Sequence, residues 1–229
     1  MEHPWLLLVK LFEALGLGDF AHAGTHIIYT WFVMLVLIVS GAIAVRGLSL
    51  VPSRMQNIFE IIISSIEEFM VEITGEEGRW FFPLAATLFL YIFISNVIGI
   101  VPGLFPPTAN INTTLSCALV VFCFTHFIGV KYHGVKYIKH FMGPVWWLAP
   151  LIFIIEIIGH FARILSLTFR LFGNMMGHEI VLGILFALAG LFLAPLPIMA
   201  LGVFVAFVQA FVFFLLSIIY FSSAMEDAH

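Results

Sequence analysis

Charged residues are scarce in this sequence. Asp, Glu, Lys and Arg make up 10% of the 229 residues, and the formal net charge is only −4. So few scattered charges exclude a basic nucleic-acid-binding surface and a polybasic lipid anchor. Apolar residues are abundant instead: they form 62% of the chain, and the mean hydropathy is +1.15. This composition is far from that of soluble globular proteins and predicts an integral membrane protein with its partners in the bilayer.

Cysteine is also rare. The chain has two, Cys117 and Cys123, which stand six residues apart in one apolar segment. This spacing suits neither a CxxC redox pair nor a zinc site, so we predict that both are buried core thiols. Among the nine histidines, His126, His133 and His140 recur every seven residues, but the latter two lie in a lysine-rich connector. We therefore predict no metal site and no cofactor.

Long apolar runs predict an all-α protein with about five membrane spans. A transmembrane helix needs about 20 apolar residues, so 229 residues leave room for five or six helices in a single membrane domain. The expected spans are residues 27–45, 81–101, 115–130, 144–193 and 196–221. The third follows Asn112, whose side chain is suited to cap a helix.

Residues 52–75 have a different character from the spans. Acidic and polar residues interrupt a set of apolar side chains that recur at helical spacing, namely Ile58, Ile61, Ile62, Ile66 and Phe69. This periodicity predicts an amphipathic helix at the membrane surface.

The apolar stretch 144–193 is too long for one helix that crosses the membrane at a right angle. It ends at the Ala194–Pro195–Leu196–Pro197 break. Either it forms two spans or it forms one long, steeply tilted helix, and hydropathy alone does not choose between these alternatives.

The basic residues near the span ends predict the orientation. Six cations lie in two loops, and the loop 102–114 has none; the six are Arg46, Arg54, Arg79, Lys131, Lys136 and Lys139. Because Lys and Arg are enriched in cytoplasmic loops, we expect these two loops inside and the N-terminus outside. Five spans then place the C-terminus in the cytoplasm, whereas six spans would place it outside.

Four ionisable residues interrupt the long apolar stretch: Glu156, Arg163, Arg170 and Glu179. Charges inside a membrane are costly, so each is a functional candidate. At about 100° per residue, one stripe about 80° wide and about 33 Å long contains six polar side chains: Glu156, His160, Arg163, Arg170, Asn174 and His178. A polar line of this length can hold water and relay protons.

A second stripe beside the first consists of small residues: Gly159, Ala162, Ser166, Gly173 and Gly177. Small residues at this spacing let another helix approach closely. Arg170 stands at the border of the two stripes and has no acid three or four positions away, so it needs a partner from elsewhere. The alternative interpretation is that Glu156 neutralises Arg163 and that the glycines serve packing within the chain.

Three motifs resemble one family, subunit a of F-type ATP synthases. The run 166–175, SLTFRLFGNM, is similar to the family pattern S-L-x-x-R-L-F-G-N-M. The run 107–116, PTANINTTLS, is similar to P-[ST]-A-D-x-N-x-T-L-S, and 209–213, QAFVF, to Q-A-[FY]-[IV]-F. The motifs stand in the family's order, and the resemblance covers nearly the whole chain. It implies five spans, with the last two helices forming a tilted hairpin against a ring of c subunits.

The resemblance also implies roles for single residues. Arg170 matches the essential arginine that faces the ring carboxylates, and Asn174 and Gln209 match polar residues beside it. Glu179 matches an acidic or histidine position of the outer proton half-channel, and Glu156 matches an acidic position on the inner side. We expect His178 and Gln209 to serve the outer side with Glu179, and His160 to serve the inner side with Glu156. Asn110 stands where the family often has Asp, and Asn cannot exchange a proton near neutral pH.

The family further implies a setting and a set of partners. We expect a non-catalytic proton-translocating subunit of a bacterial inner membrane, bound to the c ring, the b-subunit peripheral stalk and the rest of the synthase. The choice between H⁺ and Na⁺ lies mainly in the ring. The alternative function is a secondary transporter or ion channel; a secondary transporter should have internal repeats, and we find no convincing repeat.

Overall fold

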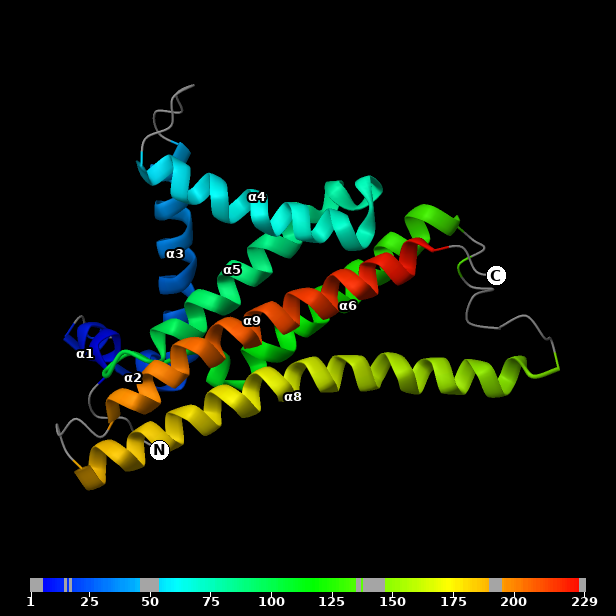
Figure 1. Ribbon diagram of the computed structural model, residues 1–229. Helices are drawn as coiled ribbons and strands as arrows, with labels where there is room; N and C mark the ends of the chain where they lie inside the picture. Colours follow the sequence, from blue (N-terminus) through cyan, green and yellow to red (C-terminus); the bar gives the residue numbers. More distant parts are fainter. Residues whose placement is uncertain are drawn as a thin grey trace.

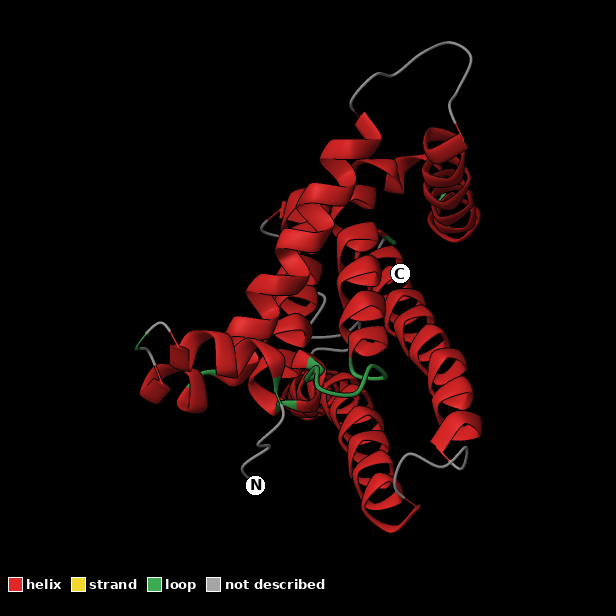
Figure 2. Ribbon diagram, turned by 90° about the vertical axis from the view of Figure 1, so that its left-hand side faces the viewer, coloured by secondary structure: helices red, strands yellow, loops and turns green. Residues whose placement is uncertain are grey.

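A computed structural model describes residues 6–14, 16, 18–45, 54–134, 137, 147–189 and 195–226, and the regular structure in these ranges is entirely helical (Figures 1 and 2). Five helical segments among them are long and apolar enough to cross a membrane. They are α3 (Thr25–Val45), η1 with α5 (Glu76–Phe81 and Phe82–Ile98), α6 (Ile111–His133), α8 (Ala149–Ala189) and α9 (Pro195–Met225). The predicted all-α membrane architecture with about five spans is confirmed.

Two short helices, α1 (Leu7–Ala14) and α2 (Gly18–Ala23), precede the first span. They pack beside the start of α3 and the loop after α5, since Leu7 N donates to Gly103 O at 3.0 Å and the Tyr29 hydroxyl donates to the same oxygen at 3.3 Å. Val9 and Tyr29 are buried in this contact. The N-terminal segment therefore marks one end of the bundle.

Helix α4 (Arg54–Thr74) lies across the opposite end of α3 (Figure 1). Its Met70 is fully buried, and its Phe69 ring lies 5.3 Å from the Phe211 ring of α9. Ile58 and Ile61 are exposed. The helix predicted at 52–75 is thus present as Arg54–Thr74; Gly75 lies beyond its end, and residues 52 and 53 lie outside the described ranges.

The main core lies between α5, α6, α8 and α9. Phe221 of α9 contacts Phe81 and Phe124, with ring centroids 5.3 Å away in both pairs. Leu171 of α8 and Phe213 of α9 are buried in the same cluster. Apolar packing among these four helices positions the polar residues of α8 and α9, which run antiparallel beside each other (Figure 1).

Helix α8 is continuous over 41 residues. The described part of the stretch 144–193 therefore forms one long helix and not two spans. At about 1.5 Å per residue it is about 60 Å long, roughly twice the hydrocarbon thickness of a bilayer. Residues 144–146 and 190–193 lie outside the described ranges. Pro195 and Pro197 stand in the first turn of α9, where proline costs no helical hydrogen bond.

Three details of the third span correct the sequence analysis. The helix begins at Ile111 rather than at residue 115, and its cap is Asn110 rather than Asn112, because Asn110 Oδ1 accepts from Asn112 N at 2.9 Å. Cys117 is buried as predicted, but Cys123 is exposed. Six residues correspond to about 240° around a helix, so the two thiols face different directions.

The described cations of the two basic segments, Arg54, Arg79 and Lys131, lie at the end of the bundle opposite α1 (Figure 1). Lys131, which follows the third span, lies 3.5 Å from the ring centroid of Trp80, and the neighbouring Arg79 pairs with Glu67 at 2.9 Å. Arg46, Lys136 and Lys139 lie outside the described residues. Glu226, at the end of α9, lines a cavity together with His133, so the last helix ends on this same side.

Candidate functional site

The polar residues of α8 fall into two clusters on either side of Arg170. Because α8 is one continuous helix, the six polar residues of the predicted stripe lie on one side of it. Seven residues, or about 10 Å, separate Arg163 from Arg170, and Asn174 follows one turn later. The first cluster packs against the second half of α9 and the second cluster against its first half.

The first cluster brings Glu156, His160 and Arg163 together. His160 Nε2 lies 3.5 Å from Glu156 Oε1, one helical turn away. The Arg163 guanidinium lies 5.2 Å from the centre of the Tyr220 ring on α9, a distance at which a cation is attracted to an aromatic face. Within the described residues no ion pair joins Glu156 to Arg163, and both side chains line the same cavity.

A polar cavity of about 240 Å³ opens beside this cluster. It lies between α6, α8 and α9, at the end of the bundle that carries the cationic loops. A single water needs only about 10–15 Å³ of such space, so the cavity is large enough for a group of waters. Its lining is Thr125, His133, Tyr137, Glu156, His160, Arg163, Tyr220, Ser223, Ala224 and Glu226.

His126 and Tyr137 extend this cluster, and the sequence analysis missed both. His126 Nδ1 lies 2.8 Å from the Tyr137 hydroxyl, and the His126 ring centroid lies 4.8 Å from that of His160. Burial, with a smaller effect of Glu156, raises the pKa of Tyr137, while Arg163 lowers it. The only feature of the sequence that could have indicated this contact was His126 inside an apolar span. Its proximity to α8 depends on how the helices pack.

The second cluster joins α8 directly to α9. Asn174 Nδ2 donates to Gln209 Oε1 at 2.7 Å, and Gln209 is buried. His178 Nε2 lies 3.4 Å from the carbonyl oxygen of Ile198. The lack of a side chain at Gly202 makes this position possible, since a Cβ there would collide with the His178 ring. Glu179 is half-buried in the same half of α8.

Asn110 lies at the corner between η2 (Pro107–Ala109) and α6, and η2 packs against α8. Two residues earlier, the buried Thr108 hydroxyl donates to Asn96 Oδ1 of α5 at 2.7 Å. Three other buried polar atoms have no hydrogen-bond partner within the described part of the chain: Ser95 Oγ, Asn96 Nδ2 and Thr168 Oγ1. Such atoms are usually satisfied by water. The sequence analysis read Ser95 and Asn96 only as members of an apolar span.

Arg170 itself is exposed on the outer face of α8. Its Nη2 donates to Ser166 Oγ at 3.3 Å, and no carboxylate of the described residues lies within ion-pair distance. Phe169, beside it, is 54% exposed. A permanently charged side chain thus projects from an apolar surface without an opposite charge from the described part of its own chain.

The small-residue stripe lies on this same outer surface. Ala162, Ser166, Gly173 and Gly177 are exposed, and Gly159 is partly exposed. A Cβ added at any of the three glycines would meet nothing within 4 Å. The alternative that these glycines serve packing within the chain is therefore wrong for the part of the molecule described.

Comparison with known proteins identifies the family. The model of the family described as ATP synthase A chain matches residues 27–222, a range that includes every predicted site residue. The chain belongs to this family. It is 72% identical over 229 residues to ATP synthase subunit a of Desulfosudis oleivorans, 60% over 240 residues to that of Syntrophobacter fumaroxidans and 54% over 232 residues to that of Geotalea daltonii. Each alignment covers 100% of both chains, and the resemblance inferred from the three motifs is confirmed.

Proposed function

We propose that this multi-pass membrane protein is the non-catalytic proton-translocating stator subunit of an F-type ATP synthase in a bacterial inner membrane. Its partners are the c-subunit ring, the b-subunit peripheral stalk and the rest of the synthase, in keeping with relatives named ATP synthase subunit a. The observation that carries the proposal is the exposed Arg170, which has no carboxylate partner among the described residues and lies between two polar clusters.

Arg170 acts on the carboxylates of the ring. A carboxylate that enters a contact of low polarity is strongly disfavoured as an isolated ion and tends to take up a proton. The guanidinium stabilises the ionised form while that carboxylate is opposite Arg170. Because arginine holds no proton that it can release, it also blocks direct passage between the two clusters. Protons must then travel around the ring, and the ring must turn.

The first cluster is the inner half-channel. It lies at the end with the cationic loops, which the distribution of Lys and Arg assigns to the cytoplasm. Glu156 and His160 border the cavity of about 240 Å³, and water in a polar space of that size can carry protons to the surface of α8 without one obligatory side chain.

The second cluster is the outer half-channel. Glu179 and His178 are its proton-exchanging groups, and the Asn174–Gln209 hydrogen bond closes it toward Arg170. Asn110 orients water rather than exchanging protons. The buried, unpartnered amide nitrogen of Asn96 supports a water-filled path on this side of the molecule.

The outer face of α8 is the surface that meets the ring. Its small residues leave room for close approach of another helix. A helix about 60 Å long exceeds the bilayer core of about 30 Å, which favours a steep tilt of the α8–α9 hairpin against the ring.

The test is the replacement of Arg170 in the assembled synthase, in membrane vesicles. We expect Arg170→Ala to abolish ATP synthesis under an imposed proton gradient while proton leakage with the catalytic head removed persists or rises. Arg170→Lys should also abolish synthesis, because a desolvated ammonium can lose its proton. Arg163→Gln, on the same helix, is the matched control and should retain most of the synthesis.

Near-normal coupled synthesis in Arg170→Ala would overturn the proposal. Solute transport by the isolated chain, independent of the ring, would support the alternative of a secondary transporter or channel instead.

A further inference from the structure

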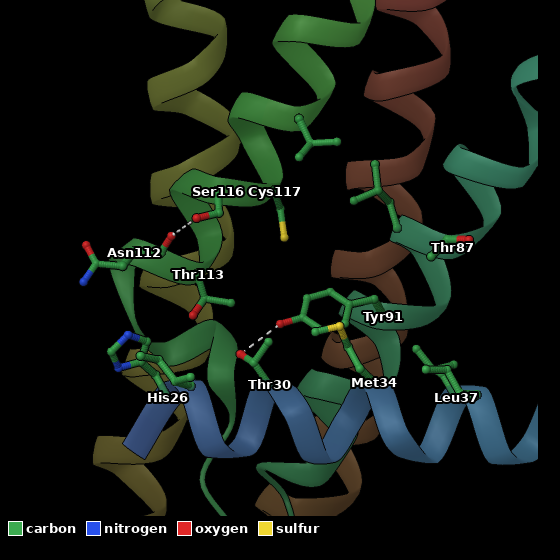
Figure 3. Close-up of a pocket in the computed structure, with 14 residues that line it drawn as sticks. His26, Thr30, Met34, Leu37, Thr87, Tyr91, Asn112, Thr113, Ser116 and Cys117 are labelled. Atoms are coloured by element: carbon green, nitrogen blue, oxygen red, sulfur yellow. Dashed lines mark hydrogen bonds between the residues drawn. The ribbon is translucent and has the colours of Figure 1, made fainter. Parts of the chain in front are cut away.

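Two hollows in the described part of the molecule differ in their chemistry. The larger, of about 580 Å³, lies between α3, α5 and α6 (Figure 3). In its wall the Tyr91 hydroxyl donates to Thr30 Oγ1 at 3.2 Å and the Ser116 hydroxyl donates to Asn112 O at 2.7 Å, so both hydroxyls are engaged within the chain. The smaller, of about 240 Å³, is lined by titratable side chains of α6, α8 and α9 and by Tyr137. Groups that can exchange protons are therefore concentrated around the smaller hollow.

His126 of α6 stands beside this smaller cavity, and the proposed proton path gives it no role. Its side chain is half-buried. Its Nδ1 lies 2.8 Å from the Tyr137 hydroxyl, and its ring centroid lies 4.8 Å from that of His160. Tyr137 and His160 both line the cavity, and His160 Nε2 lies 3.5 Å from Glu156 Oε1. Four exchangeable groups thus follow one another, from Tyr137 through two imidazoles to Glu156.

A glycine holds the Tyr137 ring in place. Gly129 of α6 is buried, and a Cβ at this position would collide with the Tyr137 ring. The absence of a side chain at Gly129 therefore lets the ring lie directly against α6. This contact keeps the Tyr137 hydroxyl within hydrogen-bond reach of one nitrogen of His126.

The bond between His126 and Tyr137 is possible in both charge states of the histidine. A tyrosine hydroxyl can donate and accept a hydrogen bond. It donates to Nδ1 of a neutral imidazole that is protonated at Nε2, and it accepts from Nδ1 of an imidazolium. His160 has a carboxylate oxygen of Glu156 as its acceptor. Each of the two imidazoles therefore has its own partner when it carries the added proton.

The two imidazoles together hold one added proton at a time, because two positive charges at this distance repel each other. Arg163 opposes a further positive charge beside the cavity, whereas Glu156 and Glu226 favour it. The other titratable groups in the described wall are His133, Tyr137 and Tyr220.

A held proton is important when free protons are rare. Diffusional encounters with a macromolecule are limited to about 10⁹–10¹⁰ M⁻¹s⁻¹, so at about pH 8 free protons reach one group only about 10–100 times per second. Typical enzyme turnover numbers are about 1–10³ s⁻¹, so this supply is limiting. An imidazole pair also takes protons from buffer acids, because imidazole changes its charge near neutral pH.

We propose that His126 and His160 share one exchangeable proton and that the Tyr137 hydroxyl passes protons between this pair and cytoplasmic water. Tyr137 gives its own proton to His126 Nδ1 and takes one from a hydronium ion or a buffer acid, so the charge of Tyr137 does not change. The imidazolium that forms shares its added proton with His160. The inference rests on the proposed function, because it requires the first cluster to be the inner half-channel.

ATP-driven proton pumping by the whole synthase in liposomes tests this role, since the inner half-channel supplies the protons in that direction. The pumping rate is measured at about pH 8 and at about pH 6.5 on the side of the catalytic head, and the readout is the ratio of the two rates. We expect His126→Gln and Tyr137→Phe to lower this ratio by more than about fivefold. A positioned proton-transfer group typically contributes about 10²–10⁴-fold, and water in the cavity replaces part of this contribution.

Two further variants separate proton exchange from packing. Tyr132→Phe makes the same chemical change at a tyrosine outside the cavity wall, whose hydroxyl lies 3.4 Å from Glu77 O. It should keep the ratio of the unmodified enzyme. Gly129→Ala displaces the Tyr137 ring and should lower the ratio as Tyr137→Phe does.

An unchanged ratio in Tyr137→Phe would overturn the inference, and so would an equal fall of the ratio in Tyr132→Phe. Tyr137→Phe keeps the ring against Gly129, so it decides the question where His126→Gln does not assemble. Arg170→Ala in the same assay tests the proposed function separately. Pumping that persists in Arg170→Ala refutes that function, whereas its loss together with an unchanged ratio in Tyr137→Phe refutes only the inference.

Discussion

The two halves of α8, to which we assign the two halves of a proton path, differ in how their polar residues are arranged. Around Glu156 the side chains border a cavity of about 240 Å³, and several titratable groups from three helices and Tyr137 surround it. Around Asn174 a direct hydrogen bond of 2.7 Å to the buried Gln209 joins the two helices. The first half has space for water, whereas the second half has specific contacts.

This difference predicts unequal tolerance of mutations. A path through clustered waters has alternatives when one side chain is lost, since bridging water is nearly as good a hydrogen-bond partner as a protein group. A path through a packed interface depends on the groups at fixed positions. We therefore expect the half-channel around Glu179 to be the more sensitive of the two.

The largest effect in this comparison is expected for Glu179→Gln. The change keeps the shape of the side chain but removes its exchangeable proton, and loss of a positioned proton-transfer group typically costs about 10²–10⁴-fold in rate. ATP synthesis in vesicles should fall by more than about tenfold, and its pH dependence should change. Glu179→Asp, which keeps the carboxyl group, is the control and should retain more activity. Normal synthesis with an unaltered pH profile would contradict the assignment of Glu179.

A smaller effect is expected for Gln209→Leu. It removes the acceptor of the Asn174 amide. The loss of one such hydrogen bond costs about 0.5–1.5 kcal/mol, which corresponds to about two- to thirteenfold in rate if it acts on the proton path. Synthesis should fall by that factor, and Gln209→Glu, which keeps an acceptor, should recover part of it. Val208→Leu, at the neighbouring exposed position, should have no effect. Equal activity in Gln209→Leu and Val208→Leu would show that this contact is only structural.

Glu156→Gln should be milder still. Its neighbours His160, Tyr137 and Glu226 also line the cavity, so water and these groups can replace it. We expect synthesis to fall by less than about threefold, because bridging waters remain in place. A loss as complete as that of Glu179→Gln would mean that the two halves are equally dependent on single residues.

The last prediction concerns sidedness and changes no activity. Single cysteines at Glu76 and Val101, in a chain with Cys117 and Cys123 replaced by Ala, should react from opposite sides of the membrane. Both positions are accessible, with the Glu76 side chain 73% exposed and Val101 48% exposed. A membrane-impermeant thiol reagent should reach Glu76→Cys only from the cytoplasmic side. Labelling of both cysteines from the same side would contradict the assignment of the two halves to opposite sides of the membrane.

Much of this architecture could be predicted because each helix is recognisable from its own run of apolar residues and from the spacing of the polar ones. The polar stripe of α8 and the open small-residue stripe beside it follow from residue spacing along one continuous helix. The cap of α6 was misassigned to Asn112, since Asn110 and Asn112 are the same residue type two positions apart and only backbone geometry distinguishes them. Cys123 was misjudged because an apolar neighbourhood in sequence is also typical of a surface that faces lipid.

The sequence alone determined that the chain lies in a membrane and forms helices, because long apolar runs have few other stable structures. It also singled out an isolated arginine, because the free-energy cost of one charge in hydrocarbon is large. Only the tertiary structure decided which groups meet. Asn174 and Gln209 are 35 residues apart, and His126 reaches Tyr137 and His160 from a different helix. These contacts depend on how α6, α8 and α9 pack, and packing is set by the shapes of many apolar side chains together rather than by any local pattern.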